Sequence, residues 1–109
     1  TEPDEREARV EALREAAREC ARCPLHATRT HVVFGEGNPR SPLVIVGEGP
    51  GETEDRTGRP FVGRAGQLLD ECLRERGITR RHVFVTNVVR CRPTRPENGR
   101  LLNRAPTGE

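Results

Sequence analysis

Apolar residues gather in a few short runs that are separated by polar and turn-forming stretches. Two runs, residues 43–47 (LVIVG) and 82–86 (HVFVT), have the length of a single strand. Continuous apolar runs of this length are typical of strands buried on both faces of a parallel sheet. A third run, residues 31–34 (HVVF), predicts one more short strand.

The spacing of apolar residues predicts two helices. Residues 4–19 form the first, with an inward stripe of Val10, Leu13 and Ala17. Residues 64–76 form the second, which Gly77 ends. Its inward face is expected to hold Leu68, Leu69, Cys72 and Leu73.

The order of the predicted elements indicates an α/β fold. A strand, a long loop over residues 48–63, a helix and a second strand favour a right-handed parallel crossover. No element is predicted after Asn87. Because two helices cannot cover both faces of such a sheet, we expect residues 1–109 to be the N-terminal part of one incomplete domain.

Composition narrows the class of protein. Hydrophobic residues make up 32% of the 109 and charged residues 33%, so the core must be modest. No apolar stretch approaches the ~20 residues that span a bilayer, and no secretory signal precedes the first helix. We therefore expect a cytoplasmic, monomeric protein with no membrane partner.

Charge is distributed unevenly. All 19 basic residues are Arg, a bias that a GC-rich genome also produces. Residues 1–19 carry a net charge of −3, whereas residues 74–104 carry +7. The basic stretch predicts either contact with nucleic acid phosphates or a solvated surface.

Candidate binding residues follow the two strands. The Gly-rich stretch 47–51 comes where open α/β sheets bind ligands, but it matches neither a Walker A loop nor a dinucleotide fingerprint. Phe61, held between Pro60 and Gly63, either stacks on a flat ligand or packs into the core. Asn87 either contacts the edge of a base or caps the strand end.

Four cysteines invite a metal or cluster interpretation. Cys20 and Cys23 form a C-x-x-C pair, and Cys91 follows the second strand. In a chain without secretory features such a pattern favours metal or cluster ligation over disulfides. A zinc site that adds His26 or His31 is the alternative.

Three blocks together resemble the family 4 uracil-DNA glycosylases. They are the C-x-x-C-P-L start, GEGPGETEDRTGRPFVGRAGQLLD and VFVTNVVRCRP, in matching order from Cys20 to the end of the chain. The resemblance implies an αβα sandwich around a parallel sheet, a [4Fe–4S] cluster and hydrolysis of the uracil N-glycosidic bond in DNA. The base would be flipped out of the stack and read in a pocket.

The resemblance also assigns roles to individual residues. Glu48 and Glu54 would lie near the sugar and the attacking water, Phe61 would stack on uracil, and Asn87 would bond its Watson–Crick edge. The identity of the base stays open, because Gly49 stands where the best-known glycosylase family has a catalytic Asp. Further pocket residues would be Gly49, Pro50 and Gly51, and the cluster ligands Cys20, Cys23 and Cys91.

The resemblance leaves parts of the enzyme unaccounted for. The fourth ligand is expected after Glu109, and a later His-bearing block is missing, so this chain is expected to be an inactive fragment. Cys72 matches no ligand position and is interpreted as a small buried hydrophobe.

Other classes of protein stay open beside this one. One is a cluster-containing nucleic-acid-binding or electron-transfer module without hydrolytic activity. Another is a uracil-DNA cross-linking relative, whose basic insertion ends in a nucleophilic His. Residues 95–104 contain no His, which argues against it. A glycosylase of this kind would act on uracil-containing DNA in the nucleoid of a bacterium or archaeon.

Overall fold

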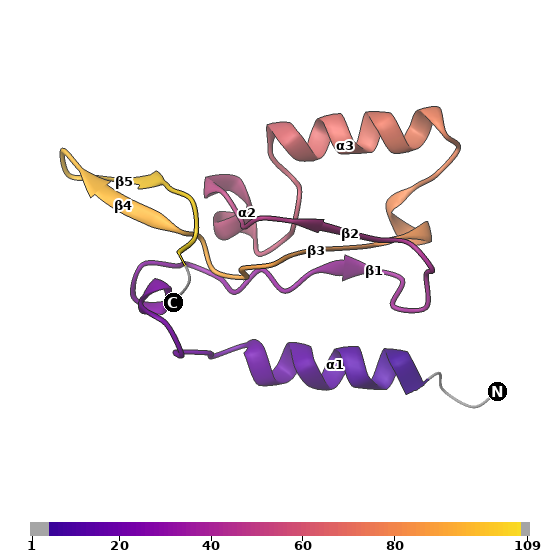
Figure 1. Ribbon diagram of the computed structural model, residues 1–109, viewed down its shortest axis with the longest axis horizontal. Coiled ribbons are helices and arrows are strands. Elements are labelled where there is room, and N and C mark those ends of the chain that lie inside the picture. Colours follow the sequence, from indigo (N-terminus) through magenta and orange to yellow (C-terminus); the bar gives the residue numbers. More distant parts are fainter. Residues whose placement is uncertain (1–4, 108–109) are drawn as a thin grey trace.

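The computed structural model describes residues 5–107 and shows a sheet between two helices. Helix α1 (Glu5–Ala17) lies along one face of the sheet, and helix α3 (Arg64–Glu75) lies along the other (Figure 1). The predicted α/β class and the helix–sheet–helix layering are confirmed.

The central sheet has three strands in the order β1-β3-β2. Strand β2 (Val44–Gly47) runs parallel to β3 (Phe84–Asn87), and the register pairs Gly47 with Asn87 at their ends. Strand β1 (Glu36–Gly37) pairs with β3 in the antiparallel direction, so the sheet is mixed rather than wholly parallel. The predicted parallel crossover through the second helix is confirmed.

The strand predicted at residues 31–34 is wrong. These residues are irregular, although Val33 is fully buried and its N–H donates to the carbonyl of Arg90 at 2.7 Å. The short strand forms two residues after the apolar run ends. Gly37 in that strand has a φ of 118° and passes so close to Val83 that a side chain there would overlap the Val83 carbonyl.

The core is small and centres on β3, in which every residue is buried. Leu73, Val83 and Val85 form its centre, and half-buried residues pack around them: Ile45, Phe61, Leu69 and Ile78. This limited core fits the low hydrophobic content of the chain.

The inward stripe of α3 is narrower than predicted. Gly66, Leu69 and Leu73 face the sheet, whereas Leu68 is 62% exposed and Cys72 is exposed. Each exposed residue is next in sequence to an inward one, and consecutive helical residues point about 100° apart. The prediction that Cys72 is buried is therefore wrong.

Helix α1 is attached mainly by polar contacts. Its half-buried face consists of Val10, Arg14 and Ala17, while Leu13 is 61% exposed, contrary to prediction. Arg14 takes the inward position: its Nη1 donates to the Gly35 carbonyl at 2.9 Å, and its guanidinium lies over the Phe34 ring. Residue 4, where we expected this helix to begin, lies outside the described residues.

A short helix and the two strands of a hairpin were not predicted from the sequence. Helix α2 (Glu52–Thr57) interrupts the expected loop, between Gly51 at its start and Gly58, with a φ of 78°, at its end. Strands β4 (Thr94–Glu97) and β5 (Arg100–Asn103) form a hairpin that projects from the body (Figure 1). Asn98 and Gly99 form its turn, both with positive φ, and Asn-Gly is a strong hairpin signal.

Short 3-10 turns complete the described structure, at Pro24–Ala27 (η1) and Arg80–His82 (η2). Strand β2 lies at the edge of the sheet, where Val44 and Val46 are 51% and 56% exposed and the preceding Leu43 is 45% exposed. Among residues 5–107, no helix is long and apolar enough to cross a membrane.

Candidate functional site

A cavity of about 230 Å³ opens where β2 and β3 end, and we call it the strand-end cavity. It lies at the carboxyl edge of the two parallel strands, the usual ligand position in open α/β sheets. Its volume is below the roughly 300–1,000 Å³ of sites for drug-sized ligands, which suits a single small ring. Its lining consists of Gly47, Glu48, Gly49, Glu54, Phe61, Ala65, Gly66 and Asn87.

Gly47 is the point at which Phe61 and Asn87 meet. A Cβ on Gly47 would lie 2.5 Å from Cζ of Phe61 and would also overlap Oδ1 of Asn87. The aromatic ring and the amide therefore flank the same glycine. The sequence predicted this meeting of two strand ends, and the structure places both side chains in one cavity.

Phe61 was predicted either to stack on a ligand or to pack into the core, and its position allows both. It is half-buried and packs against the core, and its ring also lines the strand-end cavity. Its φ of 52° lies in the left-handed region, which costs a bulky residue about 1–3 kcal/mol. Surrounding contacts must hold it there.

Asn87 is 3% exposed and has its amide at the cavity. In the described part of the chain no protein group forms a hydrogen bond with that amide. Within the described residues no unpaired side-chain N or O atom is fully shielded, so the Asn87 amide is accessible from the cavity, where solvent or a ligand can satisfy it. The arrangement leaves one acceptor and two donors for a ligand.

The two glutamates of the site differ sharply in their surroundings. Glu54 accepts three backbone N–H groups, from Gly51 at 3.0 Å, Val62 at 3.0 Å and Gly63 at 2.6 Å. Glu48 is exposed at the cavity, and residues 5–107 offer its carboxylate no hydrogen-bond donor. Glu48 is therefore free to act on a ligand or water, whereas the lone pairs of Glu54 hold the chain around Phe61.

Two of the predicted pocket residues lie just outside the cavity lining. Pro50 is buried, and Gly51 begins α2 with its N–H on Glu54. Gly49 does line the cavity, and a Cβ there would sit 3.3 Å from the ring of Pro93.

A second cavity, of about 310 Å³, brings the three predicted ligand cysteines together. Cys20 and Cys23 come from the segment after α1, and Cys91 follows β3. We call this the cysteine cavity; its lining is mostly apolar and includes Ala17, Pro24, Leu25, Val32, Val89, Arg90, Arg104, Pro106 and Thr107. Within the described residues, no three His, Cys, Asp or Glu side chains are close enough to hold a single metal ion.

Arg29 connects the two halves of the cysteine cavity. Its Nη1 donates to the carbonyl of Cys20 and lies 3.3 Å from Sγ of Cys91. Burial raises the pKa of the Cys91 thiol, and the Arg29 hydrogen bond and charge oppose that rise. A guanidinium at this point is suited to offset the negative charge of thiolates.

The two histidines of the zinc alternative do not line the cysteine cavity. Nδ1 of His26 lies 2.7 Å from the carbonyl of Cys23, and Nδ1 of His31 lies 2.6 Å from the carbonyl of Asp55. These bonds use only Nδ1 of each ring and leave Nε2 available, so the mixed Cys/His zinc site is disfavoured by the position of both rings outside the cysteine cavity.

Most arginines of the basic stretch, residues 74–104, form hydrogen bonds or ion pairs within the fold. Arg92 is buried against Asn103, Arg90 bonds the Phe34 carbonyl, and Arg104 bonds the Thr94 carbonyl. Arg80 and Arg95 pair with acids. The exposed remainder consists of Arg74, Arg76, Arg81 and Arg100. The net charge of this stretch is therefore a poor guide to a binding surface.

Sequence reasoning missed residues that shape both cavities. Gly66 lies beneath Phe61, where a Cβ would overlap the Phe61 carbonyl; an isolated Gly inside a helical pattern was the available signal. No signal in the sequence marks Arg29 or Arg80, because a single Arg does not stand out in an Arg-rich chain.

Comparisons with known proteins identify relatives of this chain. A model of the family described as the uracil DNA glycosylase superfamily matches residues 34–108. A type-4 uracil-DNA glycosylase of Thermotoga maritima is 56% identical over 104 residues, which are 95% of this chain and 50% of that protein. Those of Pyrobaculum aerophilum and Archaeoglobus fulgidus are 50% and 46% identical over 87% and 92% of this chain. The chain spans about half the length of these relatives.

Proposed function

Because the chain belongs to the uracil DNA glycosylase superfamily, we propose that it supplies the uracil-binding half of a type-4 uracil-DNA glycosylase. Residues 1–109 would be the N-terminal part of a single glycosylase domain. The observation that carries the proposal is the meeting of the Phe61 ring and the Asn87 amide at Gly47, in a cavity that Glu48 also lines.

Recognition of the base follows from the chemistry of these two side chains. The Phe61 ring offers a flat surface on which a base that is flipped out of the DNA can stack. The Asn87 amide donates to a carbonyl oxygen of uracil and accepts from the ring N3–H. Cytosine presents the opposite pattern on that edge, so the same amide rejects it.

Hydrolysis requires a water on the sugar and stabilisation of the departing uracil anion. Glu48 is the side chain that we assign to the water and to the positive charge that develops on the sugar, because its carboxylate has no competing donor. The Asn87 N–H stabilises the negative charge that develops on the base. Glu54 acts through the backbone that it binds and is a positioning residue rather than the base.

The direct test is uracil release by the intact protein that carries this chain. Single- and double-stranded oligonucleotides with one deoxyuridine should lose uracil, and matched oligonucleotides with cytosine or thymine should not. Binding to the uracil-containing DNA without release would favour the alternative, a nucleic-acid-binding module without hydrolytic activity.

We also propose that Cys20, Cys23 and Cys91 hold a [4Fe–4S] cluster. The support is the donor set: three thiols and no histidine at one apolar cavity, with Arg29 placed to offset thiolate charge. A cluster is wider than a single ion, so its ligands need not converge on one point. The group would tie the segment after α1 to the end of β3, a structural contribution.

The cluster is tested by its iron. Intact protein purified without oxygen should be brown, with broad absorption at roughly 400 nm. Cys91→Ser should lose most of the iron, whereas Cys72→Ser, the matched control at an exposed position of α3, should keep it. Stoichiometric zinc in place of iron would contradict the assignment.

The relatives come from bacteria and archaea. We propose that the protein acts in the cytoplasm, on uracil-containing DNA, as a monomer.

A further inference from the structure

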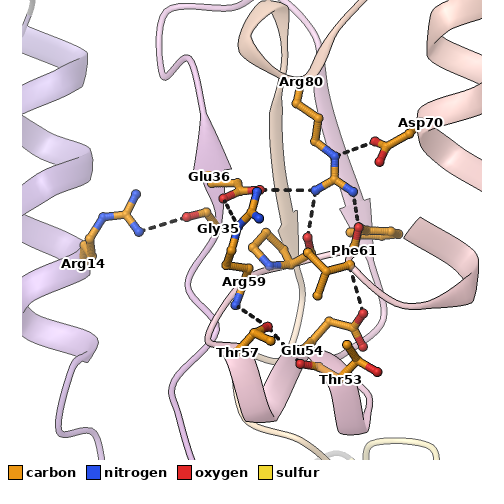
Figure 2. Close-up of polar contacts among 12 residues, drawn as sticks. Arg14, Gly35, Glu36, Thr53, Glu54, Thr57, Arg59, Phe61, Asp70 and Arg80 are labelled. Carbon is orange, nitrogen blue, oxygen red and sulfur yellow. Dashed lines mark hydrogen bonds and ion pairs between the residues drawn. The ribbon is translucent and has the colours of Figure 1, made fainter. Parts of the chain in front are cut away.

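Arg80 lies outside the strand-end cavity and has its guanidinium fixed by two acids. Its Nε donates to Oδ1 of Asp70 at 2.7 Å, and its Nη1 lies 3.3 Å from Oε1 of Glu36 (Figure 2). The side chain is only 20% exposed. These contacts join α3 and β1 to the start of η2 and give the guanidinium one orientation.

The same guanidinium binds the backbone at Phe61. Nη1 donates to the carbonyl of Pro60 at 2.8 Å, and Nη2 donates to the carbonyl of Phe61 (Figure 2). Because the two N–H donors of Arg80 bind consecutive carbonyls, they restrict rotation of the peptide between Pro60 and Phe61. That peptide determines the φ of Phe61, which is the residue in the left-handed conformation.

Glu54 and Gly66 hold the same segment from other sides. Glu54 accepts the N–H groups of Val62 and Gly63, the two residues after Phe61. Gly66 leaves just enough room for the Phe61 carbonyl. Of these three residues, Arg80 is the one that binds the carbonyls of Pro60 and Phe61, and its side chain comes from η2.

We propose that Arg80 is a positioning residue that holds the Phe61 backbone in its left-handed conformation and so directs the ring at the base. Arg80 touches neither base nor sugar, and it acts by keeping the stacking surface in place before the base arrives. This inference rests on the proposed function for its substrate, but not for its effect on the Phe61 ring.

The test compares Arg80→Ala with Arg59→Ala in the intact protein. Arg59 is a matched control because it also donates to the Glu36 carboxylate, at 2.9 and 3.1 Å, and is close to Phe61 in sequence. Its guanidinium is exposed and makes no contact with the Phe61 carbonyl. Both variants remove one Arg and one partner of Glu36; only Arg80→Ala frees the two carbonyls.

The first readout is the ring itself, observed by fluorine NMR of protein labelled with 4-fluorophenylalanine. Residues 1–109 contribute three Phe signals to the spectrum of the intact protein, and Phe61→Leu, Phe34→Leu and Phe84→Leu identify them. Arg80→Ala should shift or broaden that signal and leave those of Phe34 and Phe84 in place. Arg59→Ala should leave all three unchanged, and Arg80→Lys, which keeps a donor and the charge, should restore part of the Phe61 shift.

The second readout is uracil release from a single-stranded oligonucleotide with one deoxyuridine. Arg80→Ala should lower kcat/KM by about 5- to 150-fold, the range for loss of a base–aromatic stack, mainly through KM. Arg59→Ala should stay within about twofold, since exposed ion pairs contribute little. A merely structural role would lower the melting temperature and the active fraction without changing KM or the Phe61 signal.

The outcomes separate this inference from the proposed function. A wild-type protein that releases no uracil overturns the function, while the fluorine signal still decides the role of Arg80. An unchanged Phe61 signal with unchanged KM in Arg80→Ala overturns the inference. If that variant does not fold, Arg80→Lys decides: a native Phe61 signal and native KM contradict the inference, and an intermediate shift with a raised KM supports it.

Discussion

Asn87→Ala should abolish most uracil release by the intact protein while leaving its binding to DNA nearly intact. Asn87 is a buried residue whose amide is accessible from the strand-end cavity, and in the described structure no protein group occupies its donors or acceptor. Truncation removes the bidentate contact with the base edge together with the donor to the departing anion. Loss of one such positioned donor lowers kcat by about 100- to 1,000-fold.

The measurement is single-turnover uracil release, with DNA binding followed separately at fixed salt. Asn38→Ala is a matched control, because among the described residues the Asn38 side chain bonds only the Arg40 N–H of its own turn and lies outside the cavity lining. It should release uracil at the wild-type rate. Equal rates for Asn87→Ala and wild type would remove Asn87 from the site.

Glu54→Ala should destabilise the protein far more than Glu48→Ala, the change at the other glutamate of this cavity. The substitution leaves three backbone N–H groups without the acceptor that the carboxylate provides, at Gly51, Val62 and Gly63. A hydrogen bond to a charged group contributes about 1.5–3 kcal/mol, so the loss of three costs roughly 4 kcal/mol or more. Against a total stability of roughly 5–15 kcal/mol, this is a large fraction.

Glu48→Ala provides the contrast, since Glu48 also lines the cavity but binds none of the backbone through its side chain. Thermal unfolding should show a fall in Tm of about 10 °C or more for Glu54→Ala and little change for Glu48→Ala. Uracil release should fall in both, in Glu48→Ala with the fold intact. A Glu54→Ala protein that melts at the wild-type temperature would show that the Glu54 carboxylate does not hold the backbone around Phe61.

The strand ends of the site could be predicted because they depend on local pattern. The runs 43–47 and 82–86 are long enough in apolar residues to be buried strands, and parallel pairing brings their ends to one edge. This pairing places Asn87 beside Gly47, whereas Phe61 reaches Gly47 from the loop between α2 and α3. The resemblance to known glycosylases added their roles, which the geometry by itself does not assign.

Other features depend on tertiary contacts that no local pattern carries. Leu13 is more apolar than Arg14, yet Arg14 faces inward because Phe34 and the Gly35 carbonyl offer it partners. Helix α2 was missed because a Gly begins and ends it within a stretch that otherwise indicates a loop. The bonds of Arg80 to two carbonyls depend on where three separate elements meet.

The open side of β2 has a practical consequence for handling this polypeptide. Its outward backbone groups find no neighbouring strand within residues 5–107, and the valines beside them carry no charge to repel another chain. Natural sheets protect such borders with Lys, Pro or a covering segment. A polypeptide of these 109 residues alone should therefore aggregate at high concentration, as the free edges of β2 pair between molecules, and dilution should favour the monomer.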